Sequence, residues 1–372
     1  MDQAAEHPTD ATRPAHSGGL QPRGRTHVVK GWNVCLSALS TSQLVSDPHL
    51  VGLEPDPTNN LLLMEGDLHK RARRLVAPYF APGRLERLRG RLETLATDLV
   101  RGVRERPEAD LVTDLAEPLV LDGIFSAMEV ASARRARLSQ LAREMLGWLE
   151  PDLPPESRLR VHNAALRATA LFTRDRLDGK AVGLHAILEA AAQAGTIPEK
   201  VARSTPVVVL HGGYENPLHH LGCLIVWAAA DPERFAAAAE AAPAVLCDEI
   251  LRVFSPVRRL ARWTTSDSIE KVTSSARKGE MVWIDLESAH NDRQRFDSPD
   301  VDVSKQQRHL GFGYGRHGCP GTALARLEGA VLIQSLLTIP AEELAQFTGQ
   351  WREGVVAHGP AKIVRHATTD GS

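Results

Sequence analysis

A single cysteine in a glycine-rich loop constrains this chain more than any other feature of its sequence. The run Leu310–Gly321 places three alternating glycines ahead of Cys319, and a helical pattern starts directly afterwards at 322–326. Glycines let a backbone adopt left-handed turns and lie close against a flat group. A helix N-terminus offers partial positive charge and free N–H groups, so we expect the Cys319 thiol to be displaced toward thiolate. An anionic sulfur on such a loop suits ligation of a soft metal centre.

The same segment resembles the haem-binding loop of the cytochromes P450. That family's pattern is Phe-Gly-x-Gly-x-His/Arg-x-Cys-x-Gly, and the chain fills it with Phe312, Gly313, Gly315, His317, Cys319 and Gly321. The resemblance implies haem b as cofactor, with Cys319 as the thiolate ligand of the iron and Phe312, Gly313 and Gly321 in the cofactor-binding loop. Thiolate ligation pushes electron density toward the iron and favours O–O cleavage. The alternative for this segment is a buried, inert cysteine at a helix start.

Composition sets the bounds for the rest of the chain. Its 372 residues are 43% hydrophobic, enough for a large core, and the length alone permits one domain or two. The net charge of −2 gives no global attraction to nucleic acid or to an anionic membrane. Its four cysteines lie far apart without a CxxC pair, which argues against a disulfide framework or zinc site and favours a reducing cytoplasm.

The N-terminal part of the sequence carries its own expectations. Residues 1–19 are polar and lack the apolar stretch of a signal peptide, and no apolar run approaches the length of a transmembrane helix. We expect a disordered arm at 1–25 and a single P450 domain at 26–372. The resemblance also implies that the first helix and strand pair are missing or irregular, and that the protein is of the soluble bacterial type and monomeric.

Hydrophobic periodicity predicts a mainly α-helical fold with small β-sheets, which the resemblance identifies as the P450 fold. Apolar residues recur every three or four positions in several segments, and prolines interrupt or end them. The predicted helices cover residues 84–104, 157–178, 183–194, 198–230, 233–254 and 324–336. Short strands are predicted around 263–265, 269, 272 and 281–284, with a closing hairpin at 350–366.

Four side chains are predicted to bind the haem propionates. Each propionate requires a cation or a strong donor. His69 and Arg73 are four residues apart, so a helix would place them on one face, and they resemble the family's His-x-x-x-Arg. The resemblance assigns the same role to Arg262 and His317. For the arginine cluster at 69–74, a solvated basic surface is the alternative, and its other arginines are expected to face a redox partner.

Glu249 and Arg252 fit the family's Glu-x-x-Arg motif. A carboxylate and a guanidinium three apart on a helix can pair and hold a distant loop by further hydrogen bonds. The motif is common by chance, and its value here comes from its position about seventy residues before Cys319. Its expected role is structural: folding and support of the haem site. The segment Ser288–Asp292, with Phe296, resembles the region that follows this motif in the family.

The predicted distal residues depart from the family's pattern. Where the family has an acid followed by two threonines, this chain has Glu215, Asn216 and Pro217. The resemblance gives Glu215 and Asn216 the catalytic positions that handle dioxygen, water or substrate. An amide cannot relay a proton as a hydroxyl does. Pro217 lacks an N–H and clashes with the carbonyl of Gly213, which predicts a kink in the helix.

The resemblance implies a haem-thiolate oxidoreductase that hydroxylates a small or medium organic molecule in bacterial secondary metabolism. Electrons are expected from NAD(P)H through a ferredoxin and its reductase. Substrate contacts are expected from residues 56–66, 145–156, 207–216 and 257–262. Asn216 leaves open an atypical P450 reaction, such as oxidative coupling, cyclisation, desaturation or peroxide use. A haem-binding protein without turnover is a further alternative, although such a protein has no need of an acid at Glu215.

Overall fold

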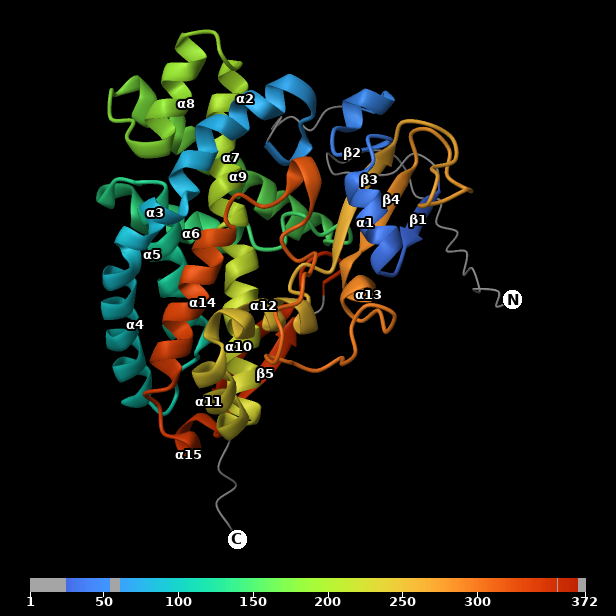
Figure 1. The fold of residues 1–372 in the computed structure, drawn as a ribbon. Helices are drawn as coiled ribbons and strands as arrows, with labels where there is room; N and C mark the ends of the chain where they lie inside the picture. Colours follow the sequence, from blue (N-terminus) through green and yellow to red (C-terminus); the bar gives the residue numbers. More distant parts are fainter. Residues whose placement is uncertain (1–24, 54–60, 353, 367–372) are drawn as a thin grey trace.

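Helices dominate the fold, and short strands gather in two small sheets (Figure 1). The computed structural model describes residues 25–53, 61–352 and 354–366. The α-helices are α1 (Trp32–Ser40), α2 (Gly66–Val76), α3 (Pro82–Leu85), α4 (Arg89–Arg104), α5 (Glu117–Ala127), α6 (Ser132–Glu144), α7 (Pro155–Leu177), α8 (Gly183–Gln193), α9 (Glu199–Gly212), α10 (Glu215–Ala230), α11 (Pro232–Ala241), α12 (Pro243–Phe254), α13 (Leu286–His290), α14 (Thr322–Leu336) and α15 (Ala341–Leu344). The strands are β1 (Thr26–Val29), β2 (Leu44–Val45), β3 (Arg259–Thr264), β4 (Met281–Asp285), β5 (Phe347–Arg352) and β6 (Gly359–Arg365). The predicted fold class is confirmed.

The four-stranded sheet joins the two ends of the described chain. Its strand order is β1-β4-β3-β2, with β1 parallel to β4 and the other two pairs antiparallel. The first pair matches Thr26 with Met281, so strands about 250 residues apart lie side by side. All of β4 is buried, as its run of apolar residues requires. The residues predicted as strands at Ile269 and Val272 instead form a bridged turn, with Ile269 opposite Thr273.

The N-terminal segment is better ordered than the sequence suggests. The expectation that its first helix and strands are missing or irregular is wrong, since β1, α1 and β2 occupy it and two of them complete the sheet. The arm predicted at 1–25 lies almost wholly outside the described residues, and the domain assignment stays a prediction. In the described parts of the chain, no helix is both long and apolar enough to cross a membrane.

Apolar spacing locates most of the helices correctly. In α4 the buried positions are Leu92, Ala96, Val100 and Val103, one stripe at helical spacing. The segment before α4, predicted as part of the same helix, is split into α3 and a 3₁₀ turn at Glu86–Leu88. The alanine-rich segment breaks before Pro243, as predicted, because proline is favoured in the first turn of a new helix.

The predicted long helix at 198–230 is two helices, α9 and α10, separated by Gly213 and Tyr214. Gly213 is packed so closely that a Cβ there would lie 2.3 Å from Cδ1 of Ile124. Pro217 falls in the first turn of α10, where its missing N–H leaves no helical hydrogen bond unmade. The kink predicted at Pro217 is therefore an interruption placed just before it. Both helices run through the core, and α10 packs against α12, α14 and the β5–β6 hairpin (Figure 1).

Candidate active site around Cys319

The cysteine loop is held by its own backbone. The N–H of Cys319 donates to the carbonyl of Phe312 (2.8 Å), and the N–H of Gly313 donates to that of Leu310 (2.8 Å). Gly313 has a φ of 66°, a left-handed conformation that favours glycine. The N–H of Gly321 lies 3.3 Å from the Cys319 sulfur, at the start of α14. The loop thus presents the thiol at a helix N-terminus, while the other three cysteines are buried and Cys319 is exposed.

In the protein alone, the Cys319 thiol does not have the lowered pKa predicted from its place at a helix start. The surrounding protein desolvates the sulfur and raises its pKa, and this outweighs the opposing effects of the Gly321 N–H, Arg73 and Thr322. A bound metal ion deprotonates a coordinating thiol outright. Thiolate formation at Cys319 therefore depends on coordination rather than on the helix terminus.

Glu65 organises the groups beside the loop, and the sequence gave no reason to single it out. Its carboxylate accepts from Nε2 of His317 (3.1 Å), Nε of Arg316 (2.7 Å) and the N–H of Ser46 (2.8 Å). Burial alone would raise the pKa of Glu65, but these donors lower it to about 2. His69 stacks on His317 with ring centroids 4.4 Å apart. Burial and the neighbouring His317 and other cations lower the pKa of His69 to about 4.

The predicted propionate donors come from three separate segments. His69 and Arg73 share α2, Arg262 lies on β3, and His317 lies in the cysteine loop. Arg73 donates to the carbonyl of Gly318, next to Cys319. The pKa of Arg73 is lowered by burial, while Cys319 opposes that effect.

Two of these donors fit an anionic cofactor group. Arg262 donates to the carbonyl of Ala261 (2.7 Å), and it forms no ion pair with a carboxylate among the described residues. Burial lowers its pKa to about 10. Nε2 of His69 is buried and has no hydrogen-bond partner within the described part of the chain. A partly buried cation and an orphaned imidazole nitrogen near an accessible thiol match the needs of a haem that carries two propionates.

Glu249 and Arg252 form a buried two-point ion pair. Nε of Arg252 lies 2.9 Å from Oε1 of Glu249, and Nη2 lies 2.8 Å from Oε2. The same guanidinium donates to the carbonyls of His290 (3.1 Å) and Asp300 (2.8 Å), and Glu249 accepts from the N–H of Asp302 (3.1 Å). One pair on α12 therefore holds two distant loops.

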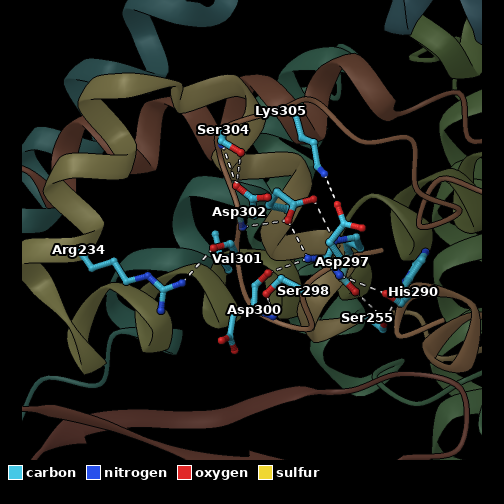
Figure 2. Close-up of polar contacts among 12 residues, drawn as sticks. Arg234, Ser255, His290, Asp297, Ser298, Asp300, Val301, Asp302, Ser304 and Lys305 are labelled. Carbon is cyan, nitrogen blue, oxygen red and sulfur yellow. Dashed lines mark hydrogen bonds and ion pairs between the residues drawn. The ribbon is translucent and has the colours of Figure 1, made fainter. Parts of the chain in front are cut away.

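The segment around this pair is itself cross-linked, as Figure 2 shows. His290 contacts Ser255 Oγ (2.8 Å), and its other ring nitrogen accepts from the N–H of Leu310 (2.9 Å), at the start of the cysteine loop. Lys305 pairs with Asp297 in the same segment. The hydrogen-bond chain runs from Arg252 through His290 to the loop that carries the cysteine.

The predicted distal residues face different environments. Glu215 is 4% exposed, and its Oε1 accepts from the N–H of Gly147 (2.8 Å). Burial raises the pKa of Glu215 to about 7, although the Gly147 N–H opposes this. Asn216, by contrast, is exposed. The structure therefore places the acid inside the core and the amide on an accessible surface.

Asn216 belongs to a stripe of accessible residues on the otherwise buried α9 and α10. The stripe consists of Val209, Gly212, Gly213, Asn216 and Pro217, which follow helical spacing. A Cβ at Gly212 would meet nothing within 4 Å. A group can therefore approach the central helices along this stripe, which overlaps the substrate-contact region predicted at 207–216.

A second predicted substrate region, 145–156, is fastened at two points. Gly147 donates to Glu215, as described above. Glu150 accepts from the backbone N–H groups of Val355, Val356 and Ala357 at 2.7–3.2 Å. Two carboxylates thus tie the loop between α6 and α7 to the central helix and to the C-terminal hairpin. Of the region predicted at 56–66, residues 56–60 lie outside the described residues.

Sequence reasoning missed His211 and His219, which flank Glu215 inside the core. Nε2 of His211 lies 3.1 Å from Oε2 of Glu215, and Nε2 of His219 lies 3.9 Å from Oε1. The signal was present, because the three residues are spaced by four and a helix places them on one face.

Comparison with known proteins adds the family. The family model described as Cytochrome P450 matches residues 244–339, which include the Glu249–Arg252 pair and Cys319. The chain is 28% identical to "Cytochrome P450 107B1" of Saccharopolyspora erythraea, over 84% of this chain and 78% of the relative. It is 29% identical to "Biflaviolin synthase CYP158A1" of Streptomyces coelicolor, over 79% of this chain and 74% of the relative.

A further relative and a solved structure agree. The chain is 28% identical to "Beta-dihydromenaquinone-9 omega-hydroxylase" of Mycobacterium tuberculosis, over 72% of this chain, and it spans 57% of that relative's length. The solved structure of P450BioI in complex with a fatty acyl-ligated acyl carrier protein matches with a TM-score of 0.78 and 22% identity, covering 90% of each chain. The fold, the cysteine loop and these relatives show that the chain belongs to the cytochrome P450 family and is an oxidoreductase.

Proposed function

We propose that this protein is a haem-thiolate monooxygenase with Cys319 as the axial ligand. The observation that carries the proposal is the accessible Cys319 thiol, presented at the start of α14 by a loop that its own backbone hydrogen bonds hold. Haem bound through a thiolate supplies dioxygen activation. Haem loading and the absorption of the reduced, carbon-monoxide-bound protein test this assignment, because a thiolate ligand produces the band that names the family.

The residues around the loop would hold the cofactor. Arg262 and His69 are proposed to bind the propionates, because neither has a carboxylate partner of its own in the described chain. Arg73 and His317 complete the donor set, each already fixed in position by Gly318 or Glu65. Phe312, Gly313 and Gly321 are proposed to line the cofactor on the cysteine side.

The Glu249–Arg252 pair is proposed to support the site without touching the reactants. It binds the backbone carbonyl of His290, and His290 in turn accepts from the N–H of Leu310 at the head of the cysteine loop. The pair therefore sets the position of that loop through fixed hydrogen bonds.

The proposed reaction is RH + O₂ + 2 e⁻ + 2 H⁺ → ROH + H₂O. By resemblance to the family, NAD(P)H supplies the electrons through a ferredoxin reductase and a ferredoxin. Arg71 and Arg74 are exposed on α2, beside Arg73, and are proposed to meet the acidic ferredoxin surface. The substrate is proposed to be a small or medium organic molecule of bacterial secondary metabolism, which the name of the biflaviolin synthase supports.

An atypical P450 reaction is the second candidate. The observation that favours it is Asn216, which is exposed where the family has a hydroxyl residue and whose amide cannot pass on a proton. Oxidative coupling, cyclisation, desaturation or peroxide use would suit such a site. Labelled dioxygen separates the two candidates, because hydroxylation must leave label in the product and coupling or desaturation leaves none.

A further inference from the structure

Three titratable side chains lie along one buried face of the central helices. His211 is on α9, and Glu215 and His219 are on α10, at a spacing of four residues. The two shorter approaches are 3.1 Å from His211 and 3.9 Å from His219, each to a different oxygen of the Glu215 carboxylate. The three side chains are 3%, 4% and 2% exposed in that order. We call this set the acid–imidazole cluster.

The cluster leaves several buried polar atoms without hydrogen-bond partners. Nδ1 of His211 and both ring nitrogens of His219 have none within the described part of the chain. A buried polar atom without a partner typically costs about 1–3 kcal/mol. Native proteins keep such atoms rarely, and often for a catalytic role or to bind ordered water. A purely structural function therefore does not explain these two histidines.

Other buried histidines of the same core are tied down by the backbone. His290 accepts from the N–H of Leu310 and contacts Ser255. His220, next to His219 in the chain, contacts the carbonyl of Cys247 at 3.1 Å. The acid–imidazole cluster differs because its nearest polar partner is a carboxylate that can itself take up a proton.

The outer end of the cluster meets the C-terminal hairpin. His219 packs against Gly359 so closely that a Cβ there would lie 2.5 Å from its Nδ1. Arg352 and His358, both half-buried on the hairpin, act electrostatically on His219. Glu150, also half-buried, acts on Glu215. The hairpin thus brings partly accessible titratable groups within electrostatic reach of the buried histidine.

The inner end of the cluster lies beside the accessible stripe. Glu215 directly precedes Asn216 in α10, and His211 directly precedes Gly212. The ring of Trp148, from the loop between α6 and α7, contacts His211 edge-on at 5.2 Å. Since the Asn216 amide cannot relay protons, the nearest group to this stripe that can do so is the Glu215 carboxyl.

We propose that the acid–imidazole cluster is a proton relay that serves the accessible stripe from the hairpin side, an inference that rests on the proposed monooxygenase function. A proton enters at His219, passes to the Glu215 carboxylate, and leaves toward the stripe. His211 holds the second carboxylate oxygen and shares the proton. Each transfer moves one proton and no electron, and solvent at the hairpin restores it. The proposed reaction consumes two protons per turnover.

The protonation states at neutral pH suit this role. Burial raises the pKa of Glu215 to about 7, so its carboxyl can both bind and release a proton near neutrality. Burial lowers the pKa of His211 to about 4, and burial with Arg352 and His358 lowers that of His219 to about 3. Arg352 counteracts the rise at Glu215 and Glu150 adds to it. The imidazoles are therefore neutral at pH 7 and free to accept a proton.

The test compares leucine and glutamine variants at each histidine in the haem-loaded protein. His219→Leu and His211→Leu remove every polar contact, whereas His219→Gln and His211→Gln keep hydrogen bonding but cannot transfer a proton. We expect both His219 variants to lower the rate of product formation at least tenfold, to raise the solvent deuterium isotope effect, and to release more reduced oxygen without product. Glutamine at 219 is expected to restore stability without restoring the rate.

A matched control lies on α8, where Nε2 of His185 is 3.4 Å from Oε1 of Glu189 in another buried pair spaced by four. His185→Leu should change neither the rate nor the isotope effect. If His219→Gln turns over at the wild-type rate, or if His185→Leu reproduces the defect, the relay is wrong.

An infrared titration separates this inference from the proposed function. The carbonyl stretch of the protonated Glu215 carboxyl is identified by its loss in Glu215→Gln. We expect its midpoint near pH 7 to move by at least one unit in His211→Leu and His219→Leu and to stay in His185→Leu. An unchanged midpoint in both cluster variants overturns the relay. A wild-type protein without the thiolate band overturns the monooxygenase proposal, whatever the midpoint.

Discussion

Oε1 of Glu65 lies 3.1 Å from Nε2 of His317, which joins the segment before α2 to the cysteine loop. The same carboxylate also accepts from Arg316, so one acid sets the position of two adjacent loop residues. Through His317 it also fixes the ring on which His69 stacks. An acid that binds no cofactor atom itself thus arranges three of the groups nearest the thiol.

Replacing Glu65 with glutamine should weaken haem retention and remove an acid-dependent part of the stability. The pKa of Glu65 is lowered to about 2, so its ion pairs stabilise the fold above the ordinary glutamate pKa and lose that effect as pH falls toward 2. We expect Glu65→Gln to be destabilised relative to wild type at pH 6, with the difference shrinking between pH 4.5 and 2. Denaturant unfolding across this range measures it. A difference that stays constant with pH would show that the carboxylate charge is unimportant.

Cys319→Ser should abolish the thiolate band of the reduced, carbon-monoxide-bound protein. A serine hydroxyl cannot provide the anionic sulfur that produces this band. Cys223→Ser is the matched control, because that thiol is buried in the core and is expected to leave the band in place. Absorption spectra of the three proteins decide the question. Survival of the band in Cys319→Ser would mean that another side chain binds the iron.

Glu249→Ala should yield protein without haem or no soluble protein. Removing one partner of a buried ion pair typically costs about 3–5 kcal/mol, and here two loops also lose their anchor. The exposed i, i+3 pair of Arg101 and Asp98 offers a control, since Asp98→Ala should cost less than about 1 kcal/mol. Haem content and thermal stability are the measurements. A stable, haem-loaded Glu249→Ala protein would contradict the supporting role.

Glu215→Gln should gain stability relative to wild type as pH rises. The folded-state pKa of Glu215 is raised to about 7, so the folded protein binds more protons than the unfolded chain between about pH 4.5 and 7. Wild-type stability therefore falls across that window, by at most about 3 kcal/mol, while the glutamine variant has no proton to lose at this position. Unfolding at pH 5 and pH 8 measures the difference. Equal pH dependence in both proteins would show that the carboxyl is ionised in the fold throughout.

Asn216→Thr should leave product formation within about tenfold of wild type, a barrier change of roughly 1.4 kcal/mol, if the enzyme is a conventional monooxygenase. Asn216 is exposed and Pro217 is fixed in the first turn of α10, so the substitution leaves the helix geometry unchanged. The product ratio and the share of NADPH electrons found in product are the readouts. A large shift toward hydroxylated side products would instead favour the atypical reaction.

Local patterns in the sequence determined the identity of the family and much of the site. The cysteine loop depends on residues within a dozen positions of each other, and the glycine at 313 does take the left-handed turn that such a loop requires. The Glu249–Arg252 spacing places both side chains on one helix face, where the structure pairs them. Helix positions followed from apolar spacing, because 3.6-residue periodicity is a local property.

Only the tertiary structure decided which polar groups meet across the chain and which are buried. Glu65 meets His317 across about 250 residues, and nothing near Glu65 in the sequence indicates its partner. Glu215 and Asn216 are adjacent in sequence, yet one is buried and the other exposed, because packing around α10 covers one side of the helix. The raised pKa values of Cys319 and Glu215 have the same origin, since desolvation depends on the surrounding protein and not on neighbouring residues in the chain.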